Sequence, residues 1–120
     1  MIPAPDMQQS MNSVNQQQRL QALASYKGRE EEFSFIQMCY DYNWVESFDW
    51  VEWKETDEAT QLRDDPDVLA RATPLQLQQL LTVILRQDRF VEGSAAEHFE
   101  SGFIGRIIDR AEVLANEDHL

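Results

Sequence analysis

The sequence predicts an all-α protein: a single compact bundle of five or six helices, preceded by a flexible N-terminal segment. Two observations predict this fold class. Residues that favour helix N-caps stand before several segments, and within those segments apolar residues recur with the helical period of about 3.6. With 120 residues, 42% of them hydrophobic, the chain is sized for one domain with one modest core. We expect this domain to span 13–120, because residues 1–12 hold two prolines and a single charge.

The N-terminal region predicts two helices. Ser13 and Gln16 have the spacing of a capping box, and Gly28 offers a left-handed stop, so we expect a first helix over 14–27. Three glutamates at 30–32 then favour the positive end of a second helix. Apolar residues cover most of the circumference of this second helix, which predicts that it is largely buried.

The middle region predicts two further helices. The stretch 43–53, NWVESFDWVEW, has aromatic residues typical of strands, but its polar and apolar positions do not alternate cleanly. Asp49, with a glutamate three residues later, instead matches a capping box and favours a helix over 50–62. Asp65 is followed by proline, which is well tolerated at the first helical position, so we expect a short helix over 66–71.

The C-terminal region predicts a central helix, a short helix and a last helix. Thr73, followed by proline and then by a glutamine, begins a helix over 74–91 whose leucines and isoleucine form a wide apolar stripe. We expect this helix at the centre of the bundle. Gly93 ends it, and Ser94 caps a short helix. A final helix over 103–116 follows the helical period.

Charge is concentrated in the middle third of the chain. The net charge is −12, and residues 30–67 hold thirteen acids against two basic residues, which gives this segment −11. Nucleic-acid binding needs clustered Lys and Arg, and anionic membranes attract the same residues. We therefore expect no direct binding to DNA or RNA and no binding to membranes. Such a surface attracts a protein partner with a basic surface.

The N-terminus and the cysteine content favour the cytoplasm. The first residues lack the basic start and apolar stretch of a signal peptide, and no run of 18 apolar residues could span a membrane. The single cysteine, Cys39, excludes an internal disulfide, as is usual in a reducing compartment.

Catalytic and metal-binding patterns are weak in this sequence. Cys39 and His98 are too few ligands for a zinc site, and His98 with Ser101 does not make a catalytic triad. The aspartates at 64, 65 and 67 lack the glycine and the spacing of a calcium loop, and helix capping accounts for the second of them. We therefore expect no metal and no cofactor.

The first candidate site combines aromatic and acidic side chains. Tryptophans are enriched at binding hot spots, and acids around them would steer a basic partner. The alternative is that these rings close the core of a small domain. The proposed partner-binding residues, which share a segment with Phe48, are Trp44, Glu46, Asp49, Trp50, Glu52 and Trp53.

The second candidate site is a charged group formed by Arg86, Asp88, Arg89 and Glu92. On one helix, Asp88 and Glu92 would stand one turn apart as like charges, which need cations nearby. Arginines of the last helix could supply them. Two interpretations stay open: a structural clamp at the corner of the last three helices, or a pocket in which the arginines bind a ligand or partner.

The sequence also resembles a known family over about residues 44–114. The motifs that carry the resemblance are FDW at 48–50, RQDRFVEG at 86–93 and FESGFI at 99–104. They are similar to the FDW, R-x-D-R-F-x-E-G and F-x-x-G-x-I motifs of a bacterial and phage-associated family of unknown function. The resemblance implies a helical fold and a bacterial or viral source. It implies no reaction, because the family has no established activity.

Together these observations predict a small, acidic, non-enzymatic protein that binds another protein, such as an accessory factor of a phage or mobile element. Two alternatives stay open. One is a nucleic-acid mimic, whose acidic middle third occupies the basic groove of a DNA- or RNA-binding protein. The other is a metal-dependent hydrolase that uses carboxylates. A mimic needs exposed acids in a row, whereas an interaction protein needs exposed rings among its acids. Self-association also stays open.

Overall fold

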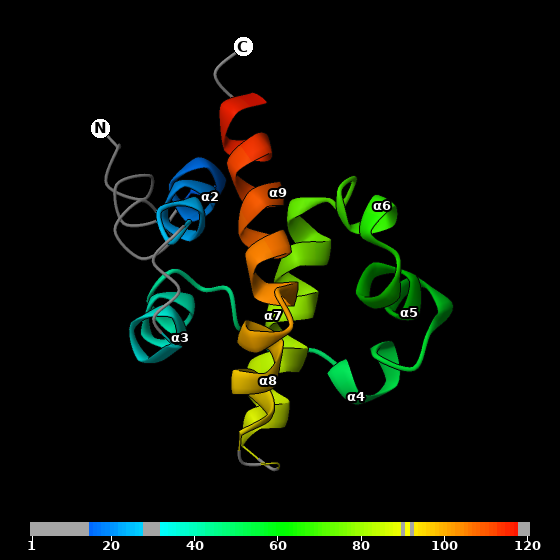
Figure 1. Ribbon diagram of the computed structural model, residues 1–120. Helices are drawn as coiled ribbons and strands as arrows, with labels where there is room; N and C mark the ends of the chain where they lie inside the picture. The colour runs from blue at the N-terminus through cyan, green and yellow to red at the C-terminus, as the bar shows by residue number, and fades with distance from the viewer. Residues whose placement is uncertain (1–14, 28–31, 90, 92, 118–120) are drawn as a thin grey trace, which may run out of the picture.

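Two long antiparallel helices form the spine of the molecule. The computed structural model describes residues 15–27, 32–89, 91 and 93–117. Within them, α7 (Pro74–Asp88) and α9 (Phe103–Glu117) each have 15 residues and run in opposite directions through the middle of the protein (Figure 1). The short α8 (Ser94–Glu100) joins them and packs against both. The predicted central helix is therefore confirmed, and α9 shares its place.

The remaining helices lie on either side of this spine (Figure 1). On one side, α2 (Gln16–Ala24) packs along α9, and α3 (Glu32–Asp41) contacts α2 and α8. On the other side, three short helices follow one another: α4 (Trp50–Trp53), α5 (Asp57–Asp64) and α6 (Pro66–Leu69). We call these three the α4–α6 arm. Its α4 contacts α7, and its α6 contacts α9.

A single apolar core fills the space between these helices. The spine contributes four fully buried residues: Leu77, Leu81, Ile104 and Ile107. The segment before the arm, with α2 and α3, adds Leu20, Phe35 and Trp44 to the same cluster. Phe35 meets the rings of Tyr26 and Phe99 edge-on, at centroid distances of 5.5 and 5.3 Å. The α4–α6 arm adds Leu62 and Leu69 to the same core. The described residues thus share one core, as an all-α fold of this size requires.

The described residues form eight helices, not five or six. The largest difference is the helix expected over 50–62, which is interrupted between α4 and α5. Thr56 is the cause, because its hydroxyl donates to the Trp53 carbonyl at 2.7 Å and accepts from the Ala59 amide at 3.2 Å. Threonine in this way competes with the helical backbone and caps a new helix.

The expected caps of the middle helices are confirmed. The side chain of Asp49 accepts from the Glu52 amide at the start of α4, and that of Asp65 accepts from the Asp67 amide at the start of α6. Thr73 forms the complete capping box of α7. These caps satisfy backbone amides that a short helix would otherwise expose.

The cap expected at Ser94 is wrong. The residue before α8 is Gly93, at φ 88°, and it offers no side-chain cap. Instead, the Asp88 carboxylate accepts from the Ala95 amide at 3.0 Å, so the end of α7 caps the start of α8. The Ser94 hydroxyl is buried and has no hydrogen-bond partner among the described residues. α7 ends at Asp88, earlier than the expected 91.

The first helix is shorter than expected. It begins at Gln16, where the Asn15 side chain accepts from the Gln18 amide at 2.8 Å, and it ends at Ala24 instead of 27. The hydroxyl of Ser25 bonds back to the Ala22 carbonyl at 2.6 Å, in competition with the backbone. The expected cap at Ser13, the stop at Gly28 and the loose segment 1–12 lie outside the described residues.

Candidate functional site

The structure brings part of each candidate group together in one hollow of the surface: Glu46 and Trp50 from the first, and Arg86 and Arg89 from the second. One wall comes from the segment before and within α4, and the other from the C-terminal end of α7. We call this hollow the acidic–aromatic groove. Its lining residues are Glu46, Ser47, Phe48, Trp50, Val51, Arg86 and Arg89. The sequence alone gave no sign that these two segments, forty residues apart, face each other.

Trp44 anchors in the core the chain segment that leads into the groove. This residue has no exposed surface, and its Nε1 donates to the Arg19 carbonyl at 3.2 Å. The Arg19 guanidinium stacks 4.3 Å above the ring and donates to the carbonyls of Tyr42 and Asn43. Trp44 therefore belongs to the core and cannot contact a partner, contrary to its place among the proposed partner-binding residues.

A buried threonine of α7, Thr82, forms hydrogen bonds with the backbone of Trp44 and of Glu46. The hydroxyl of Thr82 donates to the Trp44 carbonyl at 3.2 Å and accepts from the Glu46 amide at 3.0 Å. Thr82 has no exposed surface, so these are its means of satisfying a buried polar group. The result is that Glu46 leaves the core at a fixed point and that the groove begins there.

The other proposed partner-binding residues differ in how much surface they show. Phe48, Trp50 and Trp53 are half-buried, whereas the acids Glu46, Asp49 and Glu52 are exposed. The Phe48 and Trp53 rings meet edge-on at 6.1 Å, and the Trp53 indole N–H is buried without a hydrogen-bond partner among the described residues. An additional apolar group, Val51, is 54% exposed. Of these residues, Phe48, Trp50, Val51 and Glu46 line the groove, whereas Asp49, Glu52 and Trp53 do not.

The members of the charged group at the end of α7 have different contacts. Asp88 caps α8, while Arg86 and Arg89 line the groove. Within the described part of the chain, none of the three forms an ion pair. The arginines of α9 lie elsewhere: Arg110 donates to the Ala72 carbonyl at 2.8 Å. Asp88 thus makes one structural hydrogen bond, and Glu92 lies outside the described residues.

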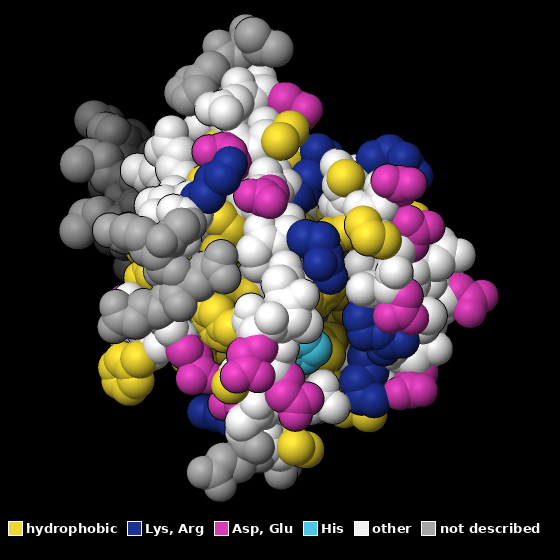
Figure 2. Space-filling model, in the orientation of Figure 1, with side chains coloured by type: hydrophobic (Ala, Val, Ile, Leu, Met, Phe, Trp, Pro, Cys, Tyr) yellow, Lys and Arg dark blue, Asp and Glu magenta, His cyan; other side chains and the backbone are white. Residues whose placement is uncertain are grey.

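Acidic residues of the α4–α6 arm are exposed but do not form an uninterrupted surface. Lys54 pairs with Glu55 at 2.6 Å, and Arg63 pairs with Asp64 at 3.0 Å. On the face shown in Figure 2, basic side chains lie among the acidic ones over this arm. Exposed pairs of this kind are screened by water and add little to stability. Their effect here is to divide the negative charge into separate patches.

The residues with nucleophilic and acid–base side chains, Cys39 and His98, are both at least half-buried. Cys39 is fully buried, and burial raises the pKa of its thiol well above the usual range, so it stays protonated. His98 is half-buried, and burial lowers the pKa of its imidazole. Among the described residues, no three His, Cys, Asp or Glu side chains gather as a metal site would require. The second histidine, His119, lies outside them.

Comparisons with known proteins identify a family and add no activity. A family of unknown function, DUF6508, matches residues 2–117 of the chain. No curated protein and no solved structure matches the chain. None of the described helices combines the length and the hydropathy that crossing a membrane demands.

Proposed function

We propose that this chain, which belongs to the DUF6508 family, is a small non-enzymatic protein that binds a basic protein partner at the acidic–aromatic groove. The observation that carries the proposal is the composition of that groove. Half-buried rings and an exposed valine provide apolar contact, the exposed carboxylate of Glu46 lines the same groove, and the exposed acids Asp49 and Glu52 belong to the same segment. Protein interfaces have this arrangement of an apolar centre within a polar rim.

The charges of the groove favour a particular kind of partner segment. Glu46, Asp49 and Glu52 would face lysines or arginines of the partner, while Arg86 and Arg89 would receive a carboxylate or stack on an aromatic ring. The net charge of −12 would steer a basic partner from a distance. We therefore expect a partner segment that carries basic residues on either side of an apolar or aromatic anchor.

The same charges argue against a nucleic-acid mimic at this groove. A mimic presents carboxylates in a continuous row, whereas here two arginines share the hollow with the acids. Basic residues also divide the acids of the α4–α6 arm. A hydrolase that uses carboxylates has no supporting geometry within the described residues.

In the setting we propose, the protein acts in the cytoplasm of a bacterium, as a factor of a phage or mobile element.

The test is affinity capture from the native host with a matched pair of variants. Val51→Glu places a charge in the groove, and Val113→Glu places the same charge on α9, where the valine is 46% exposed. Both parent valines are exposed, so neither change should disturb folding. We expect the parent and Val113→Glu to retain one basic protein and Val51→Glu to lose it.

A second pair separates the groove from the acids of α5. Glu46→Lys reverses a charge that lines the groove, and Asp57→Lys reverses one at the exposed start of α5. The proposal requires that Glu46→Lys weakens capture more than Asp57→Lys. A partner that tolerates Val51→Glu and Glu46→Lys but is lost with Asp57→Lys would place binding on the arm and favour the mimic.

A further inference from the structure

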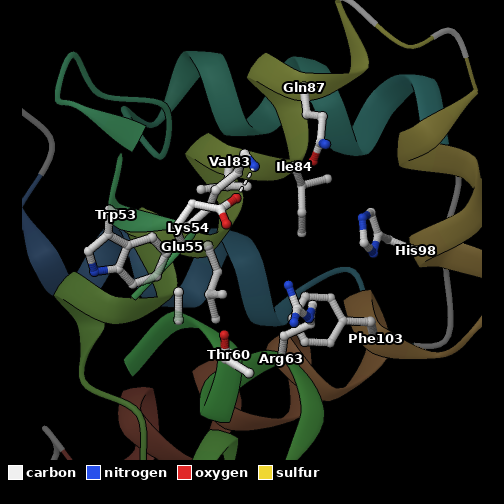
Figure 3. Close-up of a pocket in the computed structure, with 12 residues that line it drawn as sticks. Trp53, Lys54, Glu55, Thr60, Arg63, Val83, Ile84, Gln87, His98 and Phe103 are labelled. Atoms are coloured by element: carbon white, nitrogen blue, oxygen red, sulfur yellow. Dashed lines mark hydrogen bonds and ion pairs between the residues drawn. The ribbon is translucent and has the colours of Figure 1, made fainter. Parts of the chain in front are cut away.

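A second cleft, which shares no lining residue with the acidic–aromatic groove, lies between α5, α7 and α8 (Figure 3). Its volume is about 180 Å³. Leu80, Ile84 and Phe103 are buried residues of the spine and provide an apolar floor. Because an apolar cavity of about 150 Å³ can bind benzene, this cleft has room for one ring or a branched aliphatic group of that size.

Polar side chains from three different helices surround this apolar floor. Arg63 of α5, Gln87 of α7 and His98 of α8 point into the same space (Figure 3). Within the described part of the chain, the Gln87 amide and the His98 ring have no hydrogen-bond partner. Groups that are free to donate on one side of an apolar floor are what a ligand with one polar end requires.

The Asp64 carboxylate uses only some of the N–H groups of the cleft's arginine, Arg63. Arg63 uses Nε and Nη2 to donate to the Asp64 carboxylate, at 3.0 and 3.3 Å. Asp64 is exposed, with 60% of its side chain accessible, so water screens its charge. A guanidinium has five N–H groups, and those not used by Asp64 can donate to a second carboxylate. The neighbouring Lys54 and Glu55 neutralise each other.

We propose that this cleft binds a small organic carboxylate whose apolar body is about the size of a single ring. The body would lie on Ile84 and Phe103, and the carboxylate would accept hydrogen bonds from Arg63 and Gln87. The ring of His98, 5.6 Å from that of Phe103, closes the side of the cleft. The cleft lies apart from the acidic–aromatic groove, although Trp53, one of the proposed partner-binding residues, lines its edge.

The test uses benzoate as the probe, titrated into the full chain while ¹H–¹⁵N spectra are recorded. We expect saturable shifts at the amides of Gln87, His98 and Phe103. Benzyl alcohol, which has the ring without the charge, should bind at least tenfold more weakly, and acetate, which lacks the ring, should produce no saturable shift there. Charge-assisted hydrogen bonds are strong enough for a difference of this size.

Variants then assign the binding to the proposed contacts. Arg63→Gln should weaken benzoate binding roughly tenfold or more, and Gln87→Leu should also weaken it, whereas the exposed Arg71→Gln, outside the cleft, should leave it unchanged. Far-UV circular dichroism confirms that each variant is folded. The proposal is wrong if benzoate causes no saturable shift at the cleft, or if Arg63→Gln and Gln87→Leu bind it as the parent does.

Discussion

The spine and the α4–α6 arm are stabilised in different ways. In α7 and α9, long helices present a continuous apolar stripe, and most of their inward residues are fully buried. In the arm, helices of four, eight and four residues depend on side-chain caps and on a few anchors such as Leu62 and Leu69. Helices this short are not stable alone, so their position is set by packing on the spine.

This difference explains where the candidate sites lie. The apolar stripes of α7 and α9 pack into the core, whereas the short helices of the arm have only a few anchors in it. Both hollows occur where arm or loop meets spine: the acidic–aromatic groove beside the end of α7, and the cleft between α5 and α8. At both sites, polar side chains of the arm or the segment before it face polar side chains of α7 or α8, namely Arg86 and Arg89 in the groove and Gln87 and His98 in the cleft.

The largest expected effect is on the spine. Ile84→Ala and Ile107→Ala should each lower the free energy of unfolding by about 2–5 kcal/mol, because they leave cavities at positions no more than 2% exposed. Val113→Ala, on the exposed face of α9, should change it by less than about 0.5 kcal/mol. Urea unfolding followed by circular dichroism measures all three. Losses below about 1 kcal/mol at both isoleucines would contradict the assignment of the spine as the main core.

A smaller effect is expected at the corner between α7 and α8. Asp88→Ala removes the acceptor for the Ala95 amide and should cost about 0.5–2 kcal/mol, as the loss of a helix cap does. Asp88→Asn keeps a carbonyl acceptor and should cost less. Thermal unfolding of both variants checks this order. A loss near 4 kcal/mol for Asp88→Asn would instead indicate a buried ion pair at this corner.

A pH effect is expected where the arm meets α8. Burial, the largest cause, lowers the pKa of His98 below 6.5; Arg63 lowers it further and Glu97 opposes the shift. A histidine with a lowered folded pKa stabilises the fold while it is neutral. That contribution is complete above pH 6.5 and is lost as the pH falls through the folded pKa. In His98→Gln, the melting temperature should fall less than in the parent between neutral and mildly acidic pH, and equal falls would argue against a buried His98.

No measurable effect is expected from nucleic acid. Net charge of −12 with scattered arginines cannot supply the counterion release that drives such binding. Fluorescence anisotropy with labelled DNA and RNA at physiological salt should therefore show no association. Tight binding in that assay would overturn the proposed function, because it would require a basic surface that neither the spine nor the arm shows.

Local rules were enough to predict most of the fold. The caps at Asp49, Asp65 and Thr73 and the stripes of α7 and α9 involve residues three or four apart, which the sequence places side by side on a helix. Where tertiary contacts replaced a local pattern, prediction failed. Ser94 has the local form of a cap, but Asp88 takes that role across a turn. The helix expected over 50–62 overlooks a local signal, the cap at Thr56 that begins α5.

The candidate sites were only half visible in the sequence. Composition identified the aromatic and acidic residues near 44–53 and the arginines at 86 and 89, but not that they share a groove. It also could not separate Trp44 in the core from Trp50 at the surface, since both belong to one apolar-rich stretch. The cleft of Arg63, Gln87 and His98 has no local signature, because its three side chains come from three helices.

The most direct test of the central claim is a hydrogen-exchange footprint of the captured partner on the parent protein. We predict slower exchange at the backbone amides of residues 46–51 and 86–89, which form the two walls of the acidic–aromatic groove, and unchanged exchange in α5 and α6. Slowing confined to α5 and α6, with the groove unchanged, would contradict the account and place the partner on the acids of the arm.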